Sequence, residues 1–144
     1  MKWPDLKNQA AQCKAEGDYP RAIEHLTAAL HAASEAHPLD VARMNNGLAD
    51  LYLRVGNSTA AEQAARESLR IELEFGNAGR ETTDLADYHV MMAKVLEAQH
   101  RFVEAVDHVS RALPIFLDLI GADSDYTDGV SRYKQHLEEK RWRG

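Results

Sequence analysis

The sequence has little of several things on which many small proteins depend. Its 144 residues include one cysteine, four prolines and only 7% aromatic residues. A single cysteine excludes an internal disulfide framework and a Cys-x-x-Cys metal or redox site. The longest strongly apolar run, residues 112–117, is far shorter than the roughly 20 residues that a helix needs to cross a bilayer. No apolar stretch follows the N-terminal lysine, so the sequence shows no secretory signal and predicts a cytoplasmic protein.

Positive charge is also scarce. Seventeen Lys and Arg residues stand against 23 Asp and Glu residues, which gives a net charge of -6 at pH 7. This acidic balance argues against non-specific binding to nucleic acid or to an anionic membrane surface. The P-loop, the Gly-x-Gly-x-x-Gly turn, the Gly-x-Ser-x-Gly elbow and the His-Glu-x-x-His zinc motif are missing as well. We therefore expect no enzyme activity and no cofactor.

What the sequence does contain is a helical periodicity. Apolar residues recur at spacings of three and four, as in Leu48, Leu51, Tyr52 and Val55, whereas strand signals are nearly absent. Glycines and prolines divide the chain into about seven segments of this kind. The predicted fold class is all-α. We expect helices near residues 5–16, 20–36, 38–55, 58–75, 82–98, 101–120 and 125–142.

The chain also repeats itself. Three 14-residue segments begin at the predicted turn residues Gly17, Gly56 and His100, which lie 39 and then 44 residues apart. An alanine lies seven residues before each turn and another lies five residues after it, which lets two antiparallel helices approach closely. These alanines are Ala10, Ala49 and Ala93 before the turns and Ala22, Ala61 and Ala105 after them. One helix pair cannot bury its apolar face alone, so we expect three stacked pairs with one continuous core and a polar last helix as a cap.

This pattern resembles that of the tetratricopeptide-repeat (TPR) family over residues 5–121. The repeats are longer than the family's usual length of about 34 residues, and residues 37–42 and 69–76 are similar to the long-repeat form found in kinesin light chain. The resemblance implies a right-handed α-α superhelix of three helix pairs and a single domain over residues 1–144. Its parts would be repeats at 5–36, 38–75 and 82–120 and a capping helix at 125–142. Pro114, inside the sixth predicted helix, should kink that helix.

The resemblance further implies a protein-protein interaction module or adaptor, because the first helices of such pairs line a concave groove that takes a partner segment. The charged groove positions comprise five basic residues against three acidic ones, Asp50, Asp87 and Glu97. A basic lining in an acidic protein favours a protein or peptide partner that carries carboxylates. The partner-binding residues that we predict are Lys7, Lys14, Arg43, Asn46, Asp50, Arg54, Lys94 and Glu97.

One binding mode of the family is disfavoured. Some members hold a C-terminal carboxylate with a five-residue clamp, of which only Lys7 is present. The other four positions hold Ala11, Gly47, Asp87 and Met91. The sequence therefore argues against a clamp for chaperone tails.

Three alternatives stay open. The chain could self-associate as a scaffold through Trp3 or Trp142, or it could be a chaperone for a secretion-type client. In the third alternative His100, Glu104 and His108, spaced at four, would share a helical face and bind a metal ion. We predict no metal site, since that face is better explained as solvated, and we expect His89 to be a core histidine.

Overall fold

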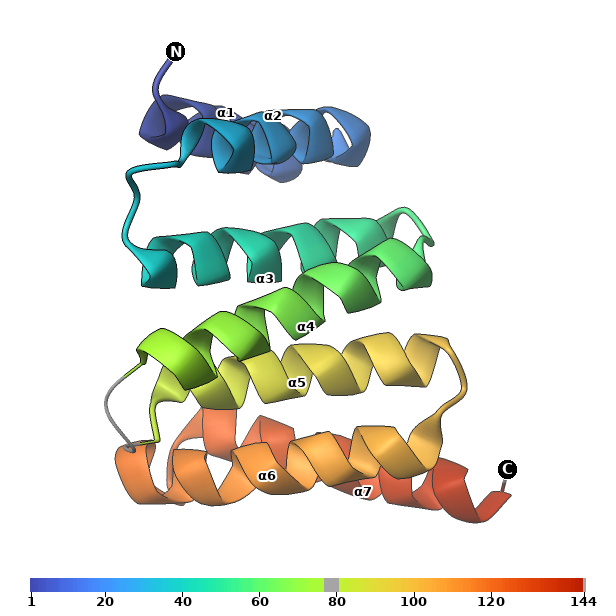
Figure 1. Cartoon of the computed structure of the whole chain (residues 1–144). Coiled ribbons are helices and arrows are strands. Elements are labelled where there is room, and N and C mark those ends of the chain that lie inside the picture. The colour runs from blue at the N-terminus through green and yellow to red at the C-terminus, as the bar shows by residue number, and fades with distance from the viewer. Residues whose placement is uncertain (77–80, 144) are drawn as a thin grey trace. The chain divides into compact units, whose positions relative to one another are not determined.

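The computed structural model describes residues 1–76 and 81–143, and in these residues the only regular elements are helices (Figure 1). Their order along the chain is α1 (Trp3–Ala15), α2 (Tyr19–Ala32), α3 (Pro38–Arg54), α4 (Ser58–Phe75), α5 (Thr83–Ala98), α6 (Phe102–Ile120) and α7 (Asp125–Arg143). The all-α prediction and its division into helices are thereby confirmed. None of the described helices combines the length and the apolar character needed to span a bilayer.

Helix α2 departs most from its prediction, because it ends at Ala32 and not near residue 36. The amide of Ala33 bonds to the carbonyl of Leu30 at 3.2 Å, and the amide of Ala36 bonds to Ala33 at 3.1 Å, so the chain turns there. His37 precedes a proline and adopts an extended conformation, with φ -62° and ψ 138°. Steric conflict with a following proline disfavours the helical conformation, so the helix has to end before it.

Polar side chains close the N-terminal ends of five helices. Each accepts a hydrogen bond from a backbone amide in the first turn, and such an amide has no partner within the helix. The acceptors are Asp18, His37, Asn57, Thr82 and Ser124, at 3.3, 3.1, 3.1, 3.0 and 3.2 Å.

The three turns predicted from the repeat share a left-handed residue. Gly17 and Gly56 have φ +80°, and His100 has φ 58°. His100 is the only described residue other than glycine with a positive φ. A side chain in this conformation costs about 1–2 kcal/mol. The third repeat therefore keeps the turn geometry of the other two without their glycine.

The chain divides into two compact units, Met1–Ile71 and Glu72–Gly144. In the first unit α1 packs on α2 and α2 on α3, and in the second α5 packs on α6 and α6 on α7. The six repeat alanines are buried, as predicted for close contact between paired helices: Ala10, Ala22, Ala49, Ala61, Ala93 and Ala105. The single domain expected from the sequence stays a prediction.

Helix α6 continues through Pro114, from Phe102 to Ile120. Proline removes one backbone hydrogen bond from a helix interior. The Pro114 side chain is exposed, so its ring meets solvent and not the core. Pro114 thus does not break α6, and the kink expected at this position stays a prediction.

Candidate functional site

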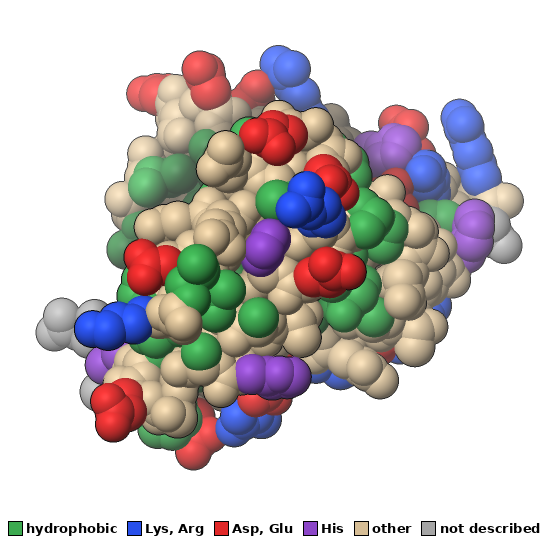
Figure 2. Space-filling model, turned by 90° about the horizontal axis from the view of Figure 1, so that it is seen from above, with side chains coloured by type: hydrophobic (Ala, Val, Ile, Leu, Met, Phe, Trp, Pro, Cys, Tyr) green, Lys and Arg blue, Asp and Glu red, His purple; other side chains and the backbone are tan. Residues whose placement is uncertain are grey.

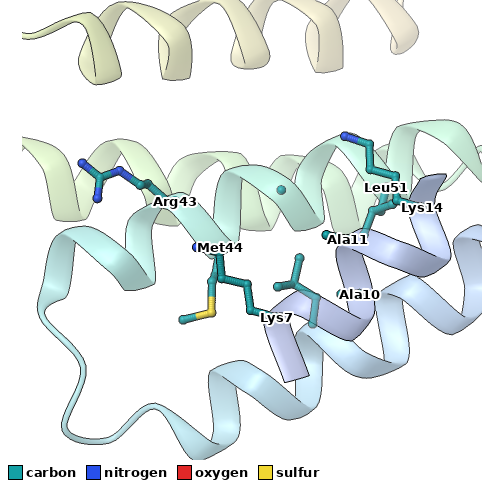
Figure 3. Close-up of a pocket in the computed structure, with 9 residues that line it drawn as sticks. Lys7, Ala10, Ala11, Lys14, Arg43, Met44 and Leu51 are labelled. Atoms are coloured by element: carbon teal, nitrogen blue, oxygen red, sulfur yellow. The ribbon is translucent and has the colours of Figure 1, made fainter. Parts of the chain in front are cut away.

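A pocket of about 160 Å³ opens in the first unit among α1, α2 and α3 (Figure 3). Its apolar floor is formed by residues that are buried or have small side chains, and its rim by three exposed cations. The floor residues are Ala10, Ala11, Leu26, Met44, Gly47 and Leu51, and the rim residues are Lys7, Lys14 and Arg43. The structure thus brings together three of the predicted partner-binding residues around one apolar depression.

Small residues make the pocket possible. Gly47 lies in the interior of α3, where glycine is about 1 kcal/mol less favourable than alanine. A Cβ atom at position 47 would lie 3.3 Å from Cδ2 of Leu26, which is a tight contact. Glycine at position 47 therefore weakens α3 but leaves space above Leu26. Ala11, on α1, contributes to the same space.

Next to this pocket, Lys14, Asp50 and Arg54 form a charged cluster across α1 and α3. The Lys14 Nζ lies 3.0 Å from Asp50 Oδ2, and the Arg54 Nε lies 3.1 Å from the same oxygen. Arg54 also donates to the hydroxyl of Tyr19 at 3.3 Å, with its guanidinium over the Tyr19 ring. Burial tends to raise the pKa of Asp50, but the two cations outweigh this and hold that pKa below its usual value. Asp50, one of the three acidic residues predicted for the groove, is therefore paired with two of the five basic ones.

The other two rim cations, Lys7 and Arg43, are exposed as well. Lys7 is exposed and makes no hydrogen bond or ion pair within residues 1–76 and 81–143. Arg43 pairs with Asp40, one turn earlier on α3, at 3.4 Å, which is a long and exposed contact. On the face seen in Figure 2, acidic and basic side chains are intermingled with apolar ones. The residues that line the pocket, by contrast, include three cations and no acidic residue.

Asn46 lies on α3 but is not among the residues that line the pocket. Its side chain is half-buried, and Oδ1 is buried without a hydrogen bond from the described part of the chain. The role predicted for Asn46, hydrogen bonding to a partner's backbone, stays a prediction.

Lys94 and Glu97 belong to the second unit, on α5. Glu97 accepts hydrogen bonds from α7: from Tyr133 at 2.9 Å, from Lys140 at 2.8 Å and, depending on the histidine tautomer, from His136 at 3.2 Å. Burial raises the pKa of Glu97, but these contacts outweigh burial and lower it overall. Glu97 is thus already bonded within the fold, whereas Lys94 is exposed.

A second carboxylate of α5 is also covered by α7. The Tyr126 hydroxyl donates to Asp87 Oδ1 at 2.6 Å, and the Tyr126 ring meets the Phe116 ring edge-on. Burial raises the pKa of Asp87 in spite of this hydrogen bond. Sequence reasoning missed both sets of contacts with α7, although Tyr133, His136 and Lys140 are spaced so that they share one helical face.

The alternative metal site is not assembled. His108 Nδ1 lies 2.9 Å from Nδ1 of His89, while Glu104 is paired with Arg101 at 2.6 Å. In the described parts of the chain, no three His, Cys, Asp or Glu side chains are grouped so that they could hold a metal ion. His89 is buried, as predicted, and burial together with His108 lowers its pKa to about 4.

Comparisons with known proteins bear on the fold. No protein-family model matches the sequence, and no curated protein does. Among solved structures, the chain is similar to BtubC (BKLC) from P. vanneervenii, with 24% identity and a TM-score of 0.81 over 94% of this chain and 54% of that one. The chain thus spans about half the length of BtubC.

Two further solved structures match nearly the whole chain. One is the first TPR of Spaghetti (RPAP3) bound to the HSP90 peptide SRMEEVD, with 14% identity and a TM-score of 0.71 over 96% of this chain and 91% of that one. The other is the Sgt2 TPR domain from Aspergillus fumigatus, with 17% identity and a TM-score of 0.72 over 99% and 82%.

Proposed function

We propose that this chain, which has the tetratricopeptide-repeat fold expected from its sequence, is a protein-interaction module that binds an acidic segment of a partner at the pocket of α1 and α3. The observation that carries the proposal is the pairing of an apolar floor with the three cations Lys7, Lys14 and Arg43. Such a lining suits a segment in which an apolar side chain lies beside carboxylates.

The electrostatics of the rim support this class of partner. Hydrogen bonds between Lys or Arg and a carboxylate are stronger than neutral ones, and Arg binds a carboxylate through two parallel bonds. Lys7 makes no hydrogen bond or ion pair with the described residues, so it is available to a ligand at low cost. Arg43 is exposed, and its ion pair with Asp40 is a long one, at 3.4 Å.

A similar structure indicates the kind of ligand. RPAP3 was solved with the HSP90 peptide SRMEEVD, in which acidic and apolar residues alternate within a few positions. The clamp that the sequence argued against is not required by our proposal, since the cations used here are Lys14 and Arg43 besides Lys7. Lys94 stays a predicted contact in the second unit, and Glu97 is held by α7.

Two alternatives concern the partner and not the type of function. Self-association is taken up below, because a specific feature of the chain favours it. No feature of the described residues favours a secretion-type client over other acidic segments.

A peptide display library selected on the intact chain tests the proposal. We expect enriched peptides to carry Asp or Glu next to Leu, Ile, Val or Met. The pocket variant Lys7→Glu/Arg43→Glu should lose this enrichment, and Arg66→Glu/Arg70→Glu on α4 makes the same change in net charge away from the pocket. Loss of binding in the pocket variant alone, with helical content unchanged by circular dichroism, supports the proposal. Enrichment of the same peptides by both variants would contradict it.

A further inference from the structure

The corner between α6 and α7 exposes apolar side chains that usually lie in a core. Leu117, Leu119 and Ile120, at the C-terminal end of α6, are 44%, 48% and 41% exposed. Gly121, with φ +86°, then ends the helix. Single exposed apolar residues are common on protein surfaces, whereas contiguous exposed apolar patches mark interaction sites.

The same corner carries unpaired negative charge. Asp118, Asp123 and Asp125 are exposed and make no ion pair or side-chain hydrogen bond with the described residues. Asp118 lies in the last turn of α6, where the helix dipole disfavours a carboxylate. This last turn contains no basic residue that could compensate its charge. Asp125, in the first turn of α7, is favoured by the dipole of that helix, whereas Asp118 has no such compensation. Residues that break local preferences in this way are expected at functional sites.

The pocket of the first unit has the complementary properties. Its volume of about 160 Å³ is close to that of a cavity of about 150 Å³ that holds benzene, so it has room for one leucine or isoleucine side chain. Its rim supplies three cations, and the corner supplies three carboxylates.

The dimensions of the two surfaces agree as well. Lys7 and Lys14 are seven residues apart on α1, a rise of about 10 Å along the helix. Residues 118–120 are helical and only residues 121–123 can extend, so the chain from Asp118 to Asp123 spans at most about 14 Å. Its carboxylates can therefore reach both lysines while an apolar residue between them occupies the pocket.

We propose that the segment Leu117–Asp125 of one copy of this chain binds in the α1–α3 pocket of a second copy, so that the protein self-associates. An apolar side chain of the segment enters the pocket, and the aspartates pair with Lys7, Lys14 and Arg43. The inference rests on the proposed function, because it names one occupant of the same pocket.

Sedimentation of the full chain over a wide range of concentrations tests this self-association. We expect the mass of the wild type to rise with concentration. The pocket variant Lys7→Glu/Arg43→Glu and the segment variant Asp118→Lys/Asp123→Lys should each associate about tenfold more weakly or not at all. The control Arg66→Glu/Arg70→Glu should behave as the wild type.

A mixture of the two variants provides the sharper measurement. The pocket variant keeps an intact segment and the segment variant keeps an intact pocket, so the mixture should form a complex that neither forms alone. A fluorescein-labelled peptide of residues 116–126 should bind the wild type and the segment variant but not the pocket variant.

Two results would overturn the inference. One is a wild type that stays monomeric at every concentration, together with a labelled peptide that does not bind. The other is self-association that neither variant weakens, which would point to a different surface, such as that around Trp142, whose side chain is 81% exposed. The proposed function would survive either result if the display library still yielded acidic peptides that require Lys7 and Arg43.

Discussion

Nδ1 of His89, on α5, lies 2.9 Å from Nδ1 of His108, on α6. One ring must donate its Nδ1–H and the other must accept this hydrogen bond at an unprotonated Nδ1, so at least one of the two rings is neutral. His89 is the buried member, and burial first and His108 second lower its pKa to about 4, from an ordinary value of 6.5. Arg111 also lowers this pKa and Asp107 raises it. The pair therefore links the packing of α5 on α6 to pH.

We predict that acid destabilises the second unit through His89. The unfolded chain binds a proton at His89 near pH 6.5 and the folded chain only near pH 4, so stability falls as the pH drops between these values. The shift corresponds to about 3 kcal/mol. Urea unfolding at a series of pH values measures this loss. His89→Gln should flatten the profile, and a profile as steep as that of the wild type would assign the effect to other groups.

A glycine at the third turn should stabilise the protein. His100 has φ 58°, in the place where the other two turns have Gly17 and Gly56. His100→Gly removes the strain of a side chain in this region and should raise the free energy of unfolding by about 1 kcal/mol. The loss of the edge-on contact between His100 and Phe102 offsets part of this gain.

The matched control for the third turn is Gly56→Ala. No atom lies within 4 Å of a Cβ at that position, so only the backbone conformation opposes the change. Denaturant unfolding should show a loss of similar size for Gly56→Ala. Opposite signs for the two variants are expected. A destabilised His100→Gly protein would mean that the ring contact matters more than the strain.

Removal of the Glu97 carboxylate should loosen α7. Glu97→Ala leaves Tyr133 and Lys140 without their common acceptor and should lower stability by about 1–3 kcal/mol. In this variant the backbone amides of α7 should exchange their hydrogens with solvent faster than the backbone amides of α6. Glu139→Ala, an exposed carboxylate on α7, serves as the control. Equal exchange in the two variants would show that the apolar contacts of α7 hold it by themselves.

The Glu97 contacts also predict an effect of pH. The pKa of Glu97 is lowered in the folded chain, so its stabilising effect is complete above the ordinary glutamate pKa of 4.5 and is lost as the pH falls below that value. The protection factors of the α7 amides, which correct for the intrinsic pH dependence of exchange, should therefore fall at acid pH in the wild type and stay constant in Glu97→Ala.

Asp50→Asn should strengthen the binding of acidic peptides. Asp50 holds Lys14 at 3.0 Å and Arg54 at 3.1 Å, and without its charge both cations become available to a ligand. We expect a severalfold higher affinity for the labelled peptide of residues 116–126, and a steeper decrease of affinity with salt. Fluorescence anisotropy measures both. A lower affinity would show that Asp50 orients Lys14 for binding rather than competing with the ligand.

The helices and the buried alanines could be predicted from the sequence because both depend on spacing along the chain. Ala10, Ala49 and Ala93 are buried where the repeat places them. The contact of His89 with His108 joins two helices, and its distance depends on how they pack, which periodicity does not determine. The alternative that grouped His108 with His100 and Glu104 considered one helix face only and missed the neighbour on α5.

The candidate site was predicted in part, for the same reason. Lys7, Lys14 and Arg43 were found by their distance from the turns, and they do line one pocket. Asp50 was counted among the acidic residues of the groove, but its pairing with Lys14 and Arg54 was not predicted, because these two partners lie on two different helices. Gly47 was interpreted only as a position where the residue of the five-residue clamp is missing, whereas the structure shows that the missing side chain provides space.

Because Gly47 and Ala11 contribute almost no side chain, the walls of the pocket beside them are helix backbone, which does not change rotamer. A bound side chain therefore meets a nearly fixed volume and is selected by its size. Each carbon added at position 47 or 11 would shrink that volume by one step. Single substitutions at these two positions could therefore change the size of the ligand side chain that fits the pocket. The cations that bind the rest of the ligand would be unchanged.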